Sequence, residues 1–341
     1  MEILKISKKD FYSFIDQKIA AKESKTIGVV KKGESHYVFA ELEAASDLCL
    51  DYDVTILPPK KYFQPPKEIL LKYVPKKPET YCVINECTPL TLVGVHYYDL
   101  AGIYLMDKAF SEGERDENYI KKRENALLIG MYPTKPQKNR FARSVVKDQA
   151  RKVADIMLTE ISGDLVLEIL TEKGKKYLEG AKTVSNDYSM KEIEDARNKI
   201  KDDQKLPLPA EMIPEYLDKN FEHPVWAHFA EKCYSCGSCV MVCPTCYCFD
   251  VREEVELSLA DGKRVRVWDG CMLEDFAVVA DGHNFRKDRS ARFRHRIFRK
   301  GKYLPEKYGY YGCVGCGRCA NACTVDIANP VKVFNYMEEN K

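Results

Sequence analysis

The 341-residue sequence predicts an α+β protein with an N-terminal α/β domain and a C-terminal cysteine-rich module. Two observations lead to this fold class. Short apolar runs typical of strands alternate with helical periodicity through the first half of the chain, and two cysteine runs of identical spacing occupy the last third. We therefore divide the chain into an N-terminal α/β domain at residues 1–130, a connecting α/β segment at 131–206 and the module at 207–341.

The first domain opens with a helix, predicted from Lys8 to Ala21 by apolar residues at helical spacing. A Lys32-Gly33-Glu34 turn between two apolar runs then predicts a hairpin. The remaining elements expected before the module are strands at Val54–Leu57, Tyr81–Ile84, Leu92–Val95 and Leu165–Leu170, and helices at Asp99–Ala109 and Ser189–Lys201.

The module carries an internal repeat of cysteines. The first run is Cys233, Cys236, Cys239 and Cys243, and the second is Cys313, Cys316, Cys319 and Cys323. The spacing C-x2-C-x2-C-x3-C is that of bacterial two-cluster ferredoxins, in which three thiolates hold one [4Fe-4S] cluster and the fourth Cys reaches the other cluster. The sequence thus predicts two [4Fe-4S] clusters with crossed ligands: cluster 1 on Cys233, Cys236, Cys239 and Cys323, and cluster 2 on Cys313, Cys316, Cys319 and Cys243.

Two other roles for these cysteines fit the pattern less well. Structural zinc usually uses two separated C-x2-C pairs, and disulfide frameworks belong to small secreted domains. The chain begins without the apolar stretch of a signal peptide and has no apolar run long enough for a membrane span. We therefore expect reduced thiols in an anaerobic cytoplasm. Lys and Arg total 54 against 52 Asp and Glu, and this balance gives no global field for nucleic acid.

A long insertion, at about residues 250–309, separates the two halves of the ferredoxin-like module. Within it we expect a hairpin of Val255–Leu259 with Arg264–Trp268 and a helix at Cys271–Ala280. An arginine-rich stretch follows, with Phe285, Phe293, Ile297 and Phe298 as its apolar side. One interpretation is a helix whose arginines pair with local carboxylates and cover the module. The other is positive charge close to the anionic clusters, which raises their potentials or receives an acidic electron carrier; nucleic acid is a distant third. The apolar side favours a stretch that is built into the module or a stable interface over a landing site for a diffusing carrier.

Other chemistry is sparse. The chain has neither G-x-G-x-x-G nor G-x4-G-K-[ST], so flavin and nicotinamide are expected on a partner. No catalytic residue is assigned. His283 and His295 lie near basic residues and are more often structural than metal ligands.

Several sequence strings together resemble one iron–sulfur protein family, which contains the iron–sulfur component of anaerobic sulfite reductase and the sulfhydrogenase beta subunit. In the module they are Cys233-Tyr-Ser-Cys-Gly-Ser-Cys239, Cys243-Pro-Thr-Cys-Tyr-Cys248, Trp268-Asp-Gly-Cys-Met272, Gly282-His-Asn-Phe-Arg286 and Gly312-Cys-Val-Gly-Cys-Gly-Arg318. Before it they are Leu57-Pro-Pro-Lys-Lys-Tyr-Phe63, Val93-Gly-Val-His-Tyr-Tyr-Asp99 and Arg123-Glu-Asn-Ala-Leu-Leu-Ile-Gly130. The resemblance covers nearly the whole chain.

This resemblance implies a non-catalytic electron-transfer subunit in a larger oxidoreductase. It would relay electrons between two partners: a ferredoxin-reductase-like subunit that binds flavin and NAD(P), and a catalytic subunit of the hydrogenase, sulfite reductase or bifurcating type. Soluble ferredoxin is a further possible partner, and neither nucleic acid nor a membrane span is expected.

The sequence departs from the family pattern at one place. Relatives carry a Cys-rich stretch where this chain has Met131–Asn139, which contains no Cys. The presence in this chain of the third cluster that those relatives carry is therefore an open question. Cys246, Cys248 and Cys271, with Cys82 and Cys87 from elsewhere, are either buried thiols or a remodelled metal site. If they form such a site, the protein could instead be a sulfur-compound reductase in its own right. A scaffold stabilised by its clusters is the third, weaker alternative.

Overall fold

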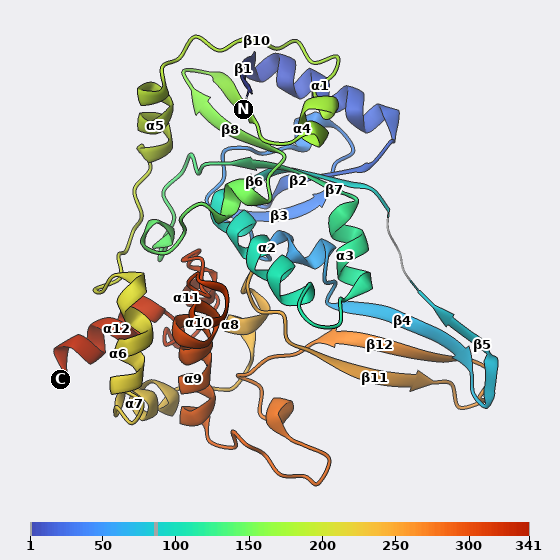
Figure 1. The fold of residues 1–341 in the computed structure, drawn as a ribbon, viewed down its shortest axis with the longest axis vertical. Coiled ribbons are helices and arrows are strands. Elements are labelled where there is room, and N and C mark those ends of the chain that lie inside the picture. Colours follow the sequence, from blue (N-terminus) through green and yellow to red (C-terminus); the bar gives the residue numbers. More distant parts are fainter. Residues whose placement is uncertain (1, 85–87, 341) are drawn as a thin grey trace.

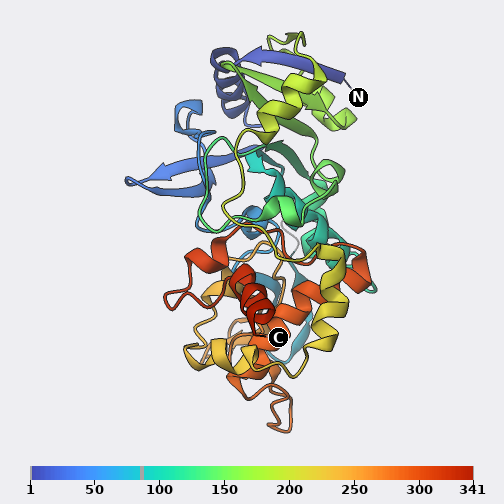
Figure 2. The same ribbon diagram turned by 90° about the vertical axis from the view of Figure 1, so that its left-hand side faces the viewer.

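The computed structural model describes residues 2–84 and 88–340 and has an α+β architecture. Figure 1 shows an N-terminal part built on a large sheet, a helical C-terminal module beneath it and a small sheet projecting to one side. Figure 2 shows the part with the large sheet above the helical module along the long axis of the molecule. No helix in the described residues is both long and apolar enough to cross a membrane.

The large sheet has eight strands in the order β10-β1-β9-β8-β7-β6-β2-β3. Its central strands β2, β6, β7 and β8 are parallel, and the outer pairs are antiparallel. The strands are β1 (Glu2–Ser7), β2 (Lys25–Lys32), β3 (His36–Glu41), β6 (Leu90–His96), β7 (Ala126–Met131), β8 (Ile156–Ile161), β9 (Asp164–Ile169) and β10 (Val184–Ser185). β6 and β7 are buried along their whole length, as expected for parallel strands covered on both faces. The sheet runs across the boundary that we place near residue 130.

Five helices accompany this sheet: α1 (Lys8–Ala21), α2 (Tyr97–Phe110), α3 (Glu117–Glu124), α4 (Glu172–Tyr177) and α5 (Met190–Asn198). The helix predicted at the N-terminus matches α1, where Ser7 caps the first turn by accepting from the amide of Asp10 at 3.1 Å. The predicted hairpin is also present as β2 and β3. α2 connects the core of the large sheet to the module, because Gly102 of this helix packs against Pro244.

A strand predicted at Val54–Leu57 is wrong. The chain there forms only an isolated bridge between Thr55 and Tyr37. Instead of continuing into a sheet, Thr55 offers its carbonyl and its hydroxyl to the guanidinium of Arg318 in the module. A tertiary contact has replaced the ladder hydrogen bonds that the local apolar pattern suggested.

The small sheet joins distant parts of the sequence in the order β11-β12-β4-β5. Its strands are β4 (Lys67–Val74), β5 (Lys77–Val83), β11 (Phe249–Val255) and β12 (Gly262–Trp268). The hairpin predicted in the insertion is therefore present, but its first strand lies earlier, before the 256–261 turn. The buried Arg266 of β12 pairs with Glu68 of the neighbouring β4 and with Asp116 at the start of α3, and the second pair ties the sheet to the body.

The module's helices are α6 (Ile213–Lys219), α7 (Val225–Glu231), α8 (Ser238–Met241), α9 (Arg289–Phe298), α10 (Leu304–Tyr308), α11 (Arg318–Asn321) and α12 (Pro330–Glu339). A π-helical turn, η7 (Arg299–Tyr303), makes α9, η7 and α10 one continuous helical stretch. Phe293, Ile297 and Phe298 of this stretch lie in the module's core, as its amphipathic pattern predicts.

Two expectations for the insertion are wrong. Residues 271–280 contain a single turn, η6 (Asp275–Ala277), rather than a helix. Gly270, Asp281 and Gly282 bound this short segment with turn residues, and this limits its helical length. Phe285 does not join the apolar side of α9, because it precedes the helix and is 68% exposed to solvent.

Candidate metal centre

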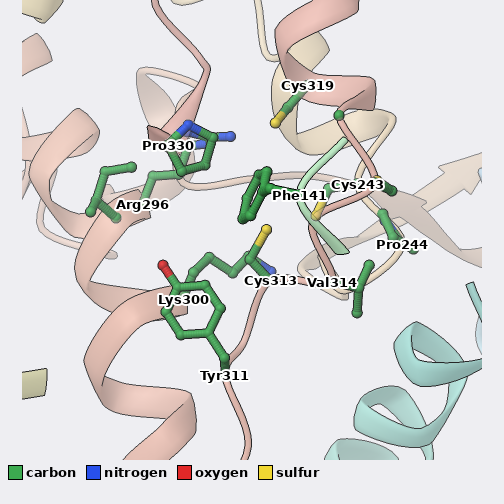
Figure 3. A pocket seen from close by; sticks show the side chains of 13 residues that line it. Phe141, Cys243, Pro244, Arg296, Lys300, Tyr311, Cys313, Val314, Cys319 and Pro330 are labelled. Carbon is green, nitrogen blue, oxygen red and sulfur yellow. The ribbon is translucent and has the colours of Figure 1, made fainter. Parts of the chain in front are cut away.

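The cysteines of both runs line two cavities of the module. The first, cavity 1, is lined by Cys233, Cys236 and Cys239 of the first run and by Cys323 of the second. The second, cavity 2, is lined by Cys313, Cys316 and Cys319 together with Cys243 (Figure 3). Each cavity thus brings together three cysteines of one run and the fourth cysteine of the other.

Backbone turns with left-handed residues form the walls of both cavities. In cavity 1 the turn contains Ser235 (φ 55°) and Gly237 (φ 74°), and the amide of Ser235 donates to Cys233 Sγ at 3.4 Å. In cavity 2, Gly315 (φ 63°) occupies the corresponding place, and its amide donates to Cys313 Sγ at 3.4 Å. N–H groups aimed at sulfur stabilise the negative charge of a cluster. This donor set of thiols and amides fits a [4Fe-4S] cube.

Two short helices carry the third cysteine of each run. α8 starts after Gly237 and contains Cys239, and α11 starts after Gly317 and contains Cys319. The chain then leaves each helix at the fourth cysteine, Cys243 or Cys323, which crosses to the other cavity. The repeated sequence therefore folds as a repeated structure.

The two cavities differ in their access to solvent. Cys236 is exposed at the rim of cavity 1, and the neighbouring Tyr234 is 74% exposed. Cys316 and Cys319 in cavity 2 are buried, and Phe141 and Tyr311 close around them. Cavity 1 is the outer and cavity 2 the inner of the two.

An ion pair holds cavity 2 against the large sheet. Arg318 stands between Cys316 and Cys319 in the sequence, and its Nη1 and Nη2 reach the two oxygens of Asp99 in α2 at 2.6 and 2.7 Å. Both side chains are almost completely buried. Burial raises the pKa of Asp99 while the guanidinium of Arg318 opposes this shift. The pair links the cysteine loop to the core of the N-terminal part.

A chain of hydrogen bonds reaches the same loop from the sheet. His96 Nδ1 lies 2.7 Å from the Tyr98 hydroxyl, which donates to Gln137 Oε1 at 3.0 Å. The Gln137 amide in turn donates to the carbonyl of Cys316. Gln137 belongs to the segment in which relatives were expected to carry cysteines, so here that segment supports cavity 2 by hydrogen bonding.

Two lysines converge on the segment between the fourth cysteine of the first run and β11. Lys60 is 2% exposed; it donates to the carbonyl of Cys246 at 2.5 Å and lies over the Trp268 ring at 4.2 Å. Burial lowers the pKa of Lys60. Lys300 donates to the carbonyl and hydroxyl of Thr245 at 2.9 and 2.7 Å. Neither lysine was identified from the sequence, because only the tertiary fold brings them to this segment.

Within residues 2–84 and 88–340, the remaining cysteines belong to the lining of neither cavity. Near the base of the β11–β12 hairpin, Cys271 is buried and Cys246 and Cys248 are half-buried, whereas Cys82 is exposed on the projecting β5 (Figure 1). Cys87 lies outside the described residues. In that described part, no three Cys, His, Asp or Glu side chains are grouped to hold a single metal ion.

Burial controls the protonation of the thiols around the cavities. It raises the pKa of Cys239 and Cys316 to about 12, and that of Cys271 to about 11. Cys243 is different, because a hydrogen bond with Cys246 holds its pKa well below the usual value. Cysteines bind iron as thiolates, so loading the cavities must release protons from the buried thiols.

Comparisons with known proteins agree with this geometry. The model of the 4Fe-4S dicluster domain matches residues 232–327, which include all eight cysteines of the two runs. Sulfhydrogenase 2 subunit beta of Pyrococcus furiosus is 35% identical over 311 residues, which cover 89% of this chain and 90% of the relative.

The chain belongs to the sulfhydrogenase beta-subunit family. The resemblance seen in the sequence strings is thereby confirmed, as is the expectation of two [4Fe-4S] clusters in this family member. No solved structure matches the chain.

Proposed function

We propose that this sulfhydrogenase-type protein is the electron-transfer subunit of a larger oxidoreductase. It relays electrons through cluster 1 on Cys233, Cys236, Cys239 and Cys323, and cluster 2 on Cys313, Cys316, Cys319 and Cys243. The observation that carries this proposal is the lining of two cavities by these crossed sets of cysteines. A [4Fe-4S] cluster supplies one-electron chemistry, and the protein supplies its ligands, burial and charge.

The unequal exposure of the cavities supports a direction for the relay. Cys236 and Tyr234 bring cavity 1 to the surface, where another protein can approach. Cavity 2 lies deeper, next to Asp99 and Gln137 of the N-terminal part. Cluster 1 is therefore the site of exchange with an external redox group, and cluster 2 is the inner member of the relay.

The partners of the relay supply its other cofactors. The relative's name identifies it as one subunit, which supports a complex with further subunits. Since this sequence has no dinucleotide-binding fingerprint, we assign flavin and NAD(P) to a ferredoxin-reductase-like partner. The terminal chemistry belongs to a catalytic partner of the hydrogenase, sulfite reductase or bifurcating type. We place the complex in the cytoplasm, where thiols stay reduced.

The test uses the complete chain, loaded with clusters under anaerobic conditions. Alone, it should accept electrons from a low-potential donor but show no turnover of NAD(P)H, sulfite, polysulfide or hydrogen. Adding the other subunits of the native complex should restore turnover. Sustained reduction of a sulfur compound by the isolated protein would contradict the relay and favour a catalytic site at Cys246, Cys248 and Cys271.

A further inference from the structure

Three cations face the cavities from one helical stretch. Arg292 and Arg296 of α9 and Lys300 of η7 are spaced four residues apart, so they lie on one face of the continuous helix. Arg292 donates to Ser235 Oγ in the turn of cavity 1 at 3.0 Å. Arg296 and Lys300 both line cavity 2 (Figure 3). We call these three residues the cationic stripe.

The stripe lacks carboxylate partners among the described residues. Arg296 is 6% exposed; its Nη2 donates to the carbonyl of Ala328 at 3.1 Å, and its Nη1 is buried without an acceptor in the described chain. Lys300 donates to the two oxygens of Thr245. On the outer side of the same stretch the cations do find carboxylates, because Arg294 pairs with Glu222 and Lys302 with Asp218. The three residues of the stripe instead donate to carbonyl and hydroxyl oxygens.

A buried cation without a counter-charge is costly, so an anion is expected beside Arg296 and Lys300. A cube held by four thiolates is anionic, and in cavity 2 it would lie against both side chains. The guanidinium of Arg296 also lies within electrostatic reach of Cys239 of cavity 1 and of Cys319 and Cys243 of cavity 2. Lys300, by contrast, is close to Cys243 and Cys313 of cavity 2.

The cations are placed differently at the two sites. Arg296 and Lys300 line cavity 2 directly. At cavity 1, Arg292 and Arg289 stand behind the lining and reach it through Ser235 Oγ and the carbonyl of Cys233. Reduction adds negative charge to a cluster, and a nearby fixed cation stabilises the reduced form and raises the reduction potential. Water near the exposed Cys236 also stabilises the reduced form of cluster 1. Solvent and salt, however, weaken the effect of fixed charges there far more than in the buried cavity 2.

We propose that Arg296 and Lys300 are the counter-charges that raise the reduction potential of cluster 2 above that of cluster 1. One electron that enters at the exposed cluster 1 is then drawn inward to cluster 2, and no proton or other reactant is required. These residues position charge and take no part in ligation. The inference rests on the proposed crossed ligands and adds the residues that set the order of the two reduction potentials.

The test is a potentiometric titration of the loaded protein followed by electron paramagnetic resonance, with no partner protein present. The signals are assigned with Cys236→Ser for cluster 1 and Cys316→Ser for cluster 2. Cluster 2 should have the higher potential in the unaltered protein. Lys300→Met should lower the potential of cluster 2 and leave cluster 1 unchanged, while Arg296→Gln should lower both. Lys300→Arg, which keeps the charge, should leave the potential of cluster 2 close to its value in the unaltered protein.

Arg294→Gln is the matched control, because it removes a cation from the solvent side of the same helix and should move neither potential. Iron analysis of each variant checks that both clusters are present. If Lys300→Met loses cluster 2, the Arg296→Gln and Lys300→Arg titrations decide the question. Unchanged potentials in variants that retain their iron, or a higher potential for cluster 1 in the unaltered protein, would overturn the inference. Because no partner takes part, such a result leaves the relay function standing.

Discussion

Arg318 and Asp99 join the cysteine module to the N-terminal part through a bidentate ion pair with N–O distances of 2.6 and 2.7 Å. Arg318 lies between two cysteines of cavity 2, and Asp99 lies in the first turn of α2. The same guanidinium also donates to the carbonyl and the hydroxyl of Thr55. The loop around cavity 2 is therefore anchored in a part of the chain more than half the sequence away.

Asp99→Asn should destabilise the protein by about 3–5 kcal/mol, because it leaves the buried charge of Arg318 uncompensated. Denaturant unfolding of the loaded protein would measure this loss. Glu222→Gln, which breaks the exposed pair with Arg294, should cost no more than about 1 kcal/mol. Equal losses in both variants would show that the Arg318–Asp99 pair is not the anchor described.

Gly315 is required by close backbone packing at cavity 2. Its φ is +63°, and a Cβ there would lie 2.6 Å from backbone atoms of Phe141 and Ala142. Gly315→Ala should therefore displace the loop and reduce the iron bound at cluster 2. Gly309→Ala is the matched control, since Gly309 also has a positive φ of 75° but has open space around its Cα. Iron content per chain distinguishes a packing effect from backbone strain, which both variants share.

His295 should make the protein sensitive to acid. Burial, with help from Arg286 and Arg299, lowers its pKa to about 4, below the value of about 6.5 for an unfolded histidine. Between these values the unfolded chain binds a proton that the folded chain does not. The contribution of neutral His295 to stability is therefore complete above about pH 6.5 and is lost as the pH falls toward 4.

His295→Gln should accordingly reduce the slope of unfolding free energy against pH in this window. His36 is exposed at the start of β3, and His36→Gln serves as the control that leaves the slope unchanged. Denaturant midpoints measured at several pH values would provide the comparison. An identical acid dependence in the unaltered protein and in His295→Gln would refute this role of burial.

The sequence predicts much of the candidate site because cluster ligation is a local pattern. Three cysteines with two residues between each pair can hold one cluster whatever their distant surroundings, and the repeat of this pattern predicts a second site. Residues that act across the fold leave no such signal. Lys60, Asp99 and Gln137 reach the cysteine loops only after the large sheet has packed on the module.

The wrong predictions have the same origin. Val54–Leu57 is apolar enough for a strand, but Thr55 bonds to Arg318, and this competing contact is invisible in a local window. Phe285 fits the apolar period of the arginine-rich stretch, yet the helix begins only at Arg289. Periodicity gives the face of a helix correctly, as Phe293 and Ile297 show, but it locates the ends poorly.

The central claim is that two clusters are held by crossed ligands, and the most direct test is the electron paramagnetic resonance spectrum of Cys323→Ser. Cys236→Ser and Cys316→Ser provide reference spectra in which cluster 1 or cluster 2 alone is altered. The crossed arrangement predicts that Cys323→Ser alters the same signal as Cys236→Ser, although Cys323 belongs to the second run. A spectrum that instead matches Cys316→Ser would show that each run keeps its own fourth ligand and would contradict the account.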